Sequence, residues 1–283
     1  MAKKRGCTGA CAIMSALETV TLCTRLRLER DLVRVAAYQA PLLAAASMDA
    51  LGLIRTQVER CEAEGIALLC CPEAVLGGLA DYAEHPTRFA ISAGAGRLDA
   101  VLAPLASDLV TTIVGFTELA DGGQLYNSAA VFQRGSVVGV YRKLHPAINR
   151  SVYEAGLTTP VFQVGALTFG IVICNDSNYF EPANSMAARG ATALFVPTNN
   201  GLPSTSARAE LVTQVRNVDI ARAVENSMWV IRADVAGRTD ALLSYGSSAI
   251  VDPAGMVVQS ARHLADDLIV ADIGTVSRVR AAV

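Results

Sequence analysis

Two stretches of the chain, residues 32–73 and 166–201, repeat one order of patterns. Each contains an apolar run, a helix-like stretch closed by a glycine, and a second apolar run cut by a proline. Continuous apolar runs are typical of strands covered on both faces, and a glycine often follows the last residue of a helix. The repeat therefore predicts strand–helix–strand units in a layered α/β protein. The predicted strands are 32–41, 66–73, 166–174 and 192–201, and the predicted helices are 48–65 and 181–191.

The later part of the chain extends this pattern. Residues 209–226 predict a long helix, and residues 227–237 predict a further core strand. Two antiparallel hairpins are also expected, since turn-forming residues separate pairs of apolar runs. The first hairpin spans 126–143 and turns at Arg134–Gly135, and the second spans 246–261 and turns at 252–255.

The first 31 residues have a different character from the rest. Their start, "MAKKRGCTGACAIMSAL", imitates the basic and apolar parts of a signal peptide, but charged residues follow without a clear cleavage site. We expect residues 1–31 to be an N-terminal extension, either a short helix or a disordered arm. No Pro/Ser-rich linker interrupts residues 32–283, which we expect to form one domain.

The composition excludes several classes of protein. The formal net charge is -2 without a long Lys/Arg block, and aromatic residues make up 5%, so neither nucleic acid nor a membrane surface is an expected partner. The seven cysteines are odd in number and irregularly spaced, which indicates reduced thiols in a cytoplasm. With three histidines and no CxxC pair, a metal site is not expected. No run of 18 apolar residues predicts a transmembrane helix.

Cys174 ends an apolar run and is followed at once by polar residues, in "GIVICNDSNYF". A buried thiol is often only a small core residue. The carboxyl ends of strands, however, are where open α/β sheets build their sites. A nucleophilic thiol needs a base and donors for the oxyanion. Glu73 and Lys143 also follow apolar runs, in "ALLCCPE" and "VVGVYRK"; each alone would be typical of an exposed turn residue.

Taken together, these motifs resemble those of the nitrilase superfamily, the carbon–nitrogen hydrolases. The family carries a Glu–Lys–Cys triad in this chain order, and here the matching motifs are "CPEAVLGG", "YRKLHP" and "ICNDSNYF". The resemblance covers roughly residues 32–275 and extends to "ARGATALFVPTNN", "ARAVENSMWVIRADVAG" and "YGSSAIVDPAG".

The resemblance implies a four-layer α-β-β-α sandwich of two mixed sheets with outer helices. It implies that Cys174 attacks the substrate, that Glu73 takes and returns the proton, and that Lys143 and the backbone N–H of Asn175 stabilise the tetrahedral intermediate. It implies no cofactor. It also implies a homodimer or larger homo-oligomer that pairs through helices beside the cysteine.

The chain departs from the family at several positions. Many members carry a second Glu shortly after the Lys, where this chain has Arg150 or Ser151; Glu154 either serves in a shifted position or is a structural loop residue. Asn175–Asp176 replaces the Trp-Glu of nitrilases proper and resembles the amide-cleaving branches. Ser177 and Asn178 stand where N-carbamoyl-D-amino-acid hydrolases carry two arginines.

The candidate substrate-binding residues are therefore Asn175, Tyr179, Asn199 and Glu154, although Asn199 could equally be a simple turn residue. The leading hypothesis is an amidase-like thiol hydrolase for a small amide or N-carbamoyl compound. The alternatives are a nitrilase and a non-catalytic binding or assembly member of the same fold. A Cys–His hydrolase of another fold fits less well, because no histidine lies near Cys174 in the sequence.

Overall fold

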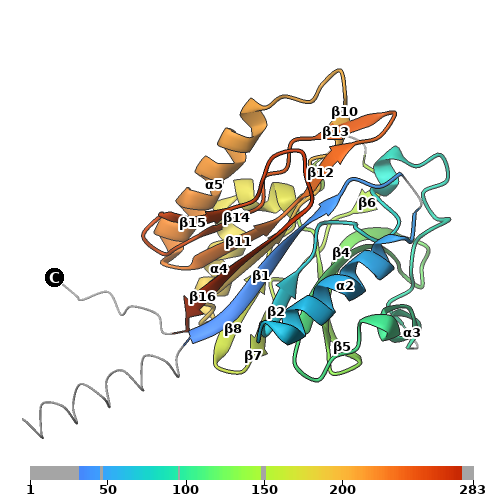
Figure 1. The fold of residues 1–283 in the computed structure, drawn as a ribbon. Coiled ribbons are helices and arrows are strands. Elements are labelled where there is room, and N and C mark those ends of the chain that lie inside the picture. The colour runs from blue at the N-terminus through green and yellow to red at the C-terminus, as the bar shows by residue number, and fades with distance from the viewer. Residues whose placement is uncertain (1–31, 45–46, 95, 148–150, 276–283) are drawn as a thin grey trace, which may run out of the picture. The chain divides into compact units, whose positions relative to one another are not determined.

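The apolar runs of the sequence form two mixed β-sheets in the computed structural model, which describes residues 32–44, 47–94, 96–147 and 151–275 (Figure 1). Within these residues the larger sheet has ten strands. In spatial order they are β10 (Leu202–Pro203), β13 (Leu242–Ser244), β12 (Val235–Arg238), β1 (Leu32–Pro41), β2 (Leu68–Cys70), β3 (Thr111–Leu119), β4 (Leu125–Gln133) and β5 (Ser136–Arg142), with β16 (Asp267–Gly274) beside β1 and β6 (Tyr153–Glu154) beside β4.

The second sheet has six strands in the described part of the chain. In spatial order they are β15 (Val257–Ser260), β14 (Ala249–Val251), β11 (Trp229–Ala233), β9 (Ala193–Pro197), β8 (Leu167–Ile171) and β7 (Val161–Val164). The predicted repeat is present, because β1 pairs with β2 and β8 with β9 in parallel, each pair joined through a helix.

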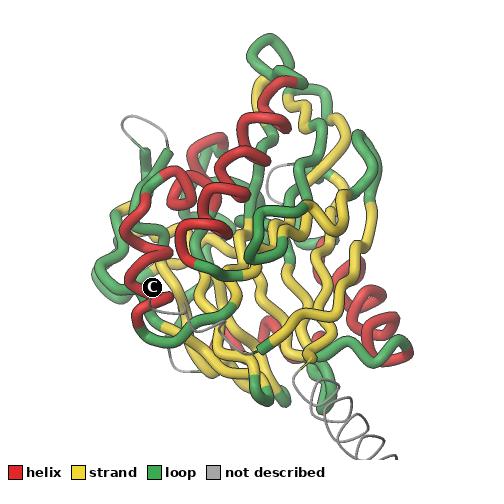
Figure 2. The backbone as a smooth tube through the Cα atoms, turned by 90° about the vertical axis from the view of Figure 1, so that its left-hand side faces the viewer, coloured by secondary structure: helices red, strands yellow, loops and turns green. Residues whose placement is uncertain are grey.

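Helices lie outside the sheets, as Figures 1 and 2 show. The α-helices are α2 (Ala50–Ala63), α3 (Arg97–Leu102), α4 (Phe180–Ala188) and α5 (Glu210–Asn226), and the short 3₁₀ helices are η1 (Ala80–Tyr82), η2 (Ala103–Leu105) and η3 (Cys174–Asn178). Two of them, α2 and α3, lie on one side of the strands, and α4 and α5 lie on the other. The expected four-layer sandwich is thus confirmed.

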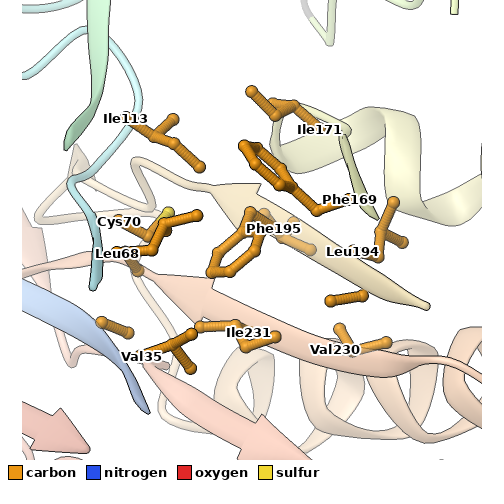
Figure 3. Close-up of a cluster of buried hydrophobic side chains, with 14 of the residues drawn as sticks. Val35, Leu68, Cys70, Ile113, Phe169, Ile171, Leu194, Phe195, Val230 and Ile231 are labelled. Carbon is orange, nitrogen blue, oxygen red and sulfur yellow. The ribbon is translucent and has the colours of Figure 1, made fainter. Parts of the chain in front are cut away.

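Side chains that point alternately to the two faces of each strand explain these layers. In β1, the side chains of Val35 and Ala37 belong to the core between the two sheets, whereas Ala36 and Tyr38 belong to the core that includes Ile54 of α2. Between the sheets, Phe169 and Phe195 pack edge to face and lie among Leu68, Cys70 and Ile113 (Figure 3). Both faces of the central strands are therefore buried, as their continuous apolar runs predicted.

The predicted strand 227–237 is wrong as a single element. The chain forms β11 in the six-stranded sheet, breaks at Asp234, and continues as β12 in the ten-stranded sheet. The Asp234 carboxylate is fully buried and accepts a hydrogen bond from the backbone N–H of Val235 at 2.8 Å. Asp234 thus lies at the point where one apolar run passes from the six-stranded to the ten-stranded sheet.

Two further strands end earlier than predicted. β2 ends at Cys70 and β8 at Ile171, so that Glu73 and Cys174 each lie three residues beyond a strand. The hairpin turn at Arg134–Gly135 is confirmed, with φ values of 49° and 76° that suit the right-handed twist of its strands. The extension predicted for residues 1–31 lies outside the described residues. None of the described helices is long and apolar enough to cross a membrane.

Candidate active site

The three candidate catalytic residues follow strands of both sheets. Glu73 and Lys143 come after β2 and β5 of the ten-stranded sheet, and Cys174 comes after β8 of the six-stranded sheet. All three lie beyond the carboxyl end of a strand, so stacking the sheets brings them together. Two adjacent residues connect them, since the Asn199 backbone N–H donates to Glu73 and Asn200 Oδ1 lies 4.0 Å from Cys174 Sγ.

Glu73 and Lys143 form a buried ion pair. The Lys143 Nζ donates to Glu73 Oε1 at 2.6 Å, and the two residues are 4% and 1% exposed. Burial is the largest single influence and opposes the charge of the Lys143 ammonium, but the charges of Glu73, Cys174 and Asp176 and the hydrogen bond to Glu73 together outweigh it, and the pKa of Lys143 is raised. The lysine is therefore a cation at neutral pH.

Two asparagines complete the surroundings of the Glu73 carboxylate. The Asn127 Nδ2 donates to Oε1 at 2.8 Å, and the Asn199 backbone N–H donates to Oε2 at 2.9 Å. Asn127 lies in β4, opposite the strand that leads to Lys143. The carboxylate thus receives donors on both oxygens, which fix its position toward the cysteine.

Cys174 has an unusual backbone conformation for a non-glycine residue. Its φ is 45°, in the left-handed region, at the start of η3. Such conformations cost about 1–3 kcal/mol and cluster at functional sites, because surrounding structure must hold them. At Cys174 one such contact comes from Ser177, whose Oγ donates to the Cys174 carbonyl oxygen at 2.7 Å.

The thiol of Cys174 is held in its neutral form. Its pKa is raised to about 12, mainly by burial and then by the Glu73 carboxylate, while Lys143 and Arg232 oppose this rise. The Lys143 charge favours the thiolate, but burial and the Glu73 charge outweigh it. Little of this thiol is ionised at neutral pH, so a fast attack on a substrate there needs a base that accepts its proton.

Asp176 joins the cysteine loop to the lysine loop. Its buried carboxylate accepts hydrogen bonds from Tyr141 Oη at 2.7 Å, from the His145 backbone N–H at 2.7 Å and from the Ile173 backbone N–H at 3.1 Å. Burial raises the pKa of Asp176, and these donors and Lys143 oppose the rise. The "Cys-x-Asp" spacing therefore sets the relative position of Cys174 and Lys143.

A second buried network lies behind the cysteine. Arg232 Nε donates to Asp219 Oδ2 at 2.8 Å, and Arg232 Nη2 donates to Ser177 Oγ at 3.0 Å. Ser177 in turn donates to Cys174. The buried Ser177 thus connects Arg232 to the loop that carries the nucleophile.

The four predicted substrate-binding residues lie in different settings. Asn175 Nδ2 donates to the His145 carbonyl oxygen at 3.1 Å, and the Tyr179 ring stacks on the His145 ring at 3.7 Å between centroids. Asn199 Nδ2 faces the Glu73 carbonyl oxygen at 3.4 Å. Glu154 is exposed on β6, and within the described residues its side chain makes no hydrogen bond or ion pair. Asn175 and Asn199 thus belong to the hydrogen-bond network around the three candidate catalytic residues. Tyr179 lies beside this network, and Glu154 does not take part in it.

Sequence reasoning missed three residues of this network: Asn127, Asn200 and Asp234. Asn200 Oδ1 lies 4.0 Å from Cys174 Sγ, and Asp234 holds the other end of the Asn200 amide. A signal was available, because Asn127 and Asp234 lie, each near a second polar residue (Ser128 and Arg232), inside the mainly apolar runs "LYNSAAVF" and "WVIRADVA". Buried polar residues at such positions require hydrogen-bond partners and so indicate a network.

Comparisons with known proteins agree with this geometry. The carbon-nitrogen hydrolase family matches residues 34–281. A nitrilase of Pyrococcus abyssi is 32% identical over 180 residues, which cover 63% of this chain and 65% of the relative. A hydrolase of Pseudomonas protegens is 31% identical over 230 residues (79% and 76%), and an omega-amidase of Danio rerio is 26% identical over 231 residues (75% and 78%). The chain therefore belongs to the carbon–nitrogen hydrolase family, as its motifs predicted.

Solved structures show the same fold. A cysteine-to-alanine mutant of the amidase of Nesterenkonia AN1, from the nitrilase superfamily, superimposes with a TM-score of 0.70 at 24% identity over 86% of this chain and 90% of that chain. Saccharomyces cerevisiae Nit3, a member of branch 10 of the superfamily, gives 0.72 at 21% identity over the same shares.

Proposed function

We propose that this protein is a thiol hydrolase that cleaves the C–N bond of a small amide or N-carbamoyl compound and releases ammonia or an amine. The observation that carries the proposal is the buried Glu73–Lys143 pair, whose opposite charges both act on the Cys174 thiol. A base and a cation fixed at one nucleophile are the groups that acyl transfer requires.

In the first half of the reaction, Glu73 accepts the thiol proton while Sγ attacks the carbonyl carbon. A C–S bond forms, and the carbonyl π electrons move to the oxygen. The Lys143 ammonium and the Asn175 backbone N–H stabilise this oxyanion; one such donor typically contributes about 10²–10³ in rate. Glu73 then gives its proton to the nitrogen, the C–N bond breaks, and a thioester remains on Cys174.

In the second half, water attacks the thioester while Glu73 accepts its proton. The C–S bond breaks, the acid is released, and the proton returns to the sulfur. The thiol's raised pKa of about 12 supports this sequence, because the neutral thiol can reform after each cycle. Every proton in the scheme passes through Glu73, and none requires a histidine.

A nitrilase is the second candidate, favoured by the relative of that name in Pyrococcus abyssi. Asn175–Asp176 after the nucleophile favours the amide instead. The test measures ammonia release from amides, carbamoyl compounds and nitriles, and then kcat/KM for an amide and a nitrile with the same side group. We expect the amide to react faster. A nitrile faster by about tenfold, about 1.4 kcal/mol of transition-state preference, would overturn the assignment.

The proposal includes a homodimer or larger homo-oligomer. Phe180 of α4 and Val224 of α5 are 52% and 49% exposed, although both are large apolar side chains. A paired face on these helices would cover them. Light scattering at micromolar concentration should give at least twice the chain mass of 29.6 kDa; a value near 29.6 kDa would contradict the pairing.

A further inference from the structure

Asn200 follows β9 and has a side-chain amide whose orientation is fixed by its partners. Its Nδ2 donates to Asp234 Oδ2 at 2.9 Å and to Ser247 Oγ at 3.2 Å, and its backbone N–H donates to Asp234 Oδ1 at 3.0 Å. Asp234 is itself buried and receives the Ser247 hydroxyl at 2.6 Å. A flipped amide would place its oxygen against this carboxylate, so only one orientation is compatible with the network.

The fixed orientation aims an acceptor at the nucleophile. Asn200 Oδ1 lies 4.0 Å from Cys174 Sγ, at the limit of a hydrogen bond that involves sulfur. The neighbouring Asn199 differs, because its Oδ1 accepts the Gly201 backbone N–H at 3.0 Å and its Nδ2 faces Glu73. The oxygen of Asn200, rather than that of Asn199, is therefore available to a molecule bound at the thiol.

We propose that Asn200 is a substrate-contacting specificity residue, whose side-chain oxygen accepts a hydrogen bond from an N–H of the scissile amide. The proposal rests on the hydrolase function proposed above. Atoms attached to the carbon that bonds to Sγ lie within hydrogen-bond reach of an acceptor in this position. An acceptor repels a developing oxyanion, so the oxygen of the intermediate turns toward the Lys143 ammonium and the nitrogen lies beside Asn200.

The consequence is a preference for substrates that carry a donor on the leaving group. Primary amides and carbamoyl groups carry an N–H there, whereas an ester or a nitrile does not. A site that offers a fixed, partly buried acceptor disfavours an analogue that lacks the donor, because the bound analogue leaves the acceptor unpaired. Asn200 accepts the hydrogen bond without taking a proton, so the proton transfers through Glu73 are unchanged.

The test compares Asn200→Ala with Asn199→Ala, an adjacent asparagine with a different role. For each variant and the wild type, kcat/KM is measured for a primary amide and for the methyl ester of the same acid, with the melting temperature as a check of folding. We expect Asn200→Ala to lose about tenfold or more on the amide and less than threefold on the ester. Asn199→Ala should lower both alike, because it loosens Glu73. Equal losses on both substrates for Asn200→Ala, or an unchanged amide rate, would overturn the proposal.

A second readout does not need turnover. The rate at which methyl methanethiosulfonate, a neutral reagent, modifies Cys174 is followed by peptide mass at pH 8 in the wild type and in Asn200→Ala. Loss of the acceptor that holds the thiol proton should speed modification at least threefold, and an unchanged rate would show that Asn200 does not face the thiol. If the wild type hydrolyses neither substrate, the proposed function fails, and this rate still decides whether Asn200 contacts the nucleophile.

Discussion

The side-chain nitrogen of Lys143 lies 2.6 Å from Oε1 of Glu73, and the pair is almost completely removed from solvent. Neither charge has bulk water to stabilise it, so each depends on the other. The pair therefore has a structural role in the folded protein as well as the catalytic roles proposed for its members.

Replacing one member of this pair should cost more stability when its partner is present than when the partner has already been replaced. We expect Glu73→Gln and Lys143→Met each to reduce the free energy of unfolding by about 3–5 kcal/mol, because each leaves a buried partner without its counter-charge. The double variant should lose less than the sum of the two. Urea unfolding of the four proteins measures this, and additive losses would contradict the dependence. Activity should fall in all three variants.

Cys174→Ala should abolish turnover without unfolding the protein. The thiol is the atom that forms the proposed acyl-enzyme, and alanine removes only the sulfur from a half-buried position. Turnover measured beside the circular dichroism spectrum checks both halves of the prediction. In the wild type, mass spectrometry of a stopped reaction should find the acyl group on Cys174. More than a trace of activity in a pure Cys174→Ala preparation would mean that another group is the nucleophile.

The Asp176 carboxylate should contribute to stability through the three donors that it satisfies. Asp176→Ala leaves buried donors unpaired, at about 1–3 kcal/mol each, so the free energy of unfolding should fall by several kcal/mol. Tyr141→Phe removes only the hydroxyl, and should cost about 1 kcal/mol. A loss of kcat for Tyr141→Phe that exceeds its loss of stability would show that the connection also positions Lys143. Equal stability of the two variants would contradict this account.

The modification of Cys174 should depend steeply on pH. Because burial and the Glu73 charge raise the pKa of its thiol to about 12, the thiolate fraction should grow about tenfold per pH unit between pH 7 and 9. Iodoacetamide labelling with peptide mass analysis measures this rate at Cys174 apart from the other thiols. Glu73→Gln removes a negative charge and should speed labelling, whereas Lys143→Met removes a positive charge and should slow it. The opposite order of the two variants would exclude the proposed arrangement of charges.

Local patterns of the sequence were enough to predict much of the fold. The bounds of β1 and the turn at Arg134–Gly135 match their predictions, because a proline and a glycine mark these ends directly. The motifs also identified Glu73, Lys143 and Cys174, which the structure brings together. Their catalytic roles stay predictions until the variants are measured.

What the sequence could not supply depends on long-range pairing. The run at 227–237 reads as one strand, whereas the structure divides it at Asp234, whose carboxylate is bound by Asn200 and Ser247. Likewise, nothing local distinguishes Asn199 from Asn200, because their different roles arise from partners on other segments. Glu154 follows the lysine motif closely in the sequence, yet the short strand β6 leaves it exposed.

The break at Asp234 has a consequence for how the molecule opens. Ala233 ends a strand of one sheet and Val235 begins a strand of the other, with a single residue between them. A fluctuation that frees β12 from β1 therefore pulls directly on β11, and the two sheets cannot lose their order independently at this point. Amide hydrogens in β11 and β12 should exchange with solvent deuterium in one correlated event, although they belong to different hydrogen-bonded layers.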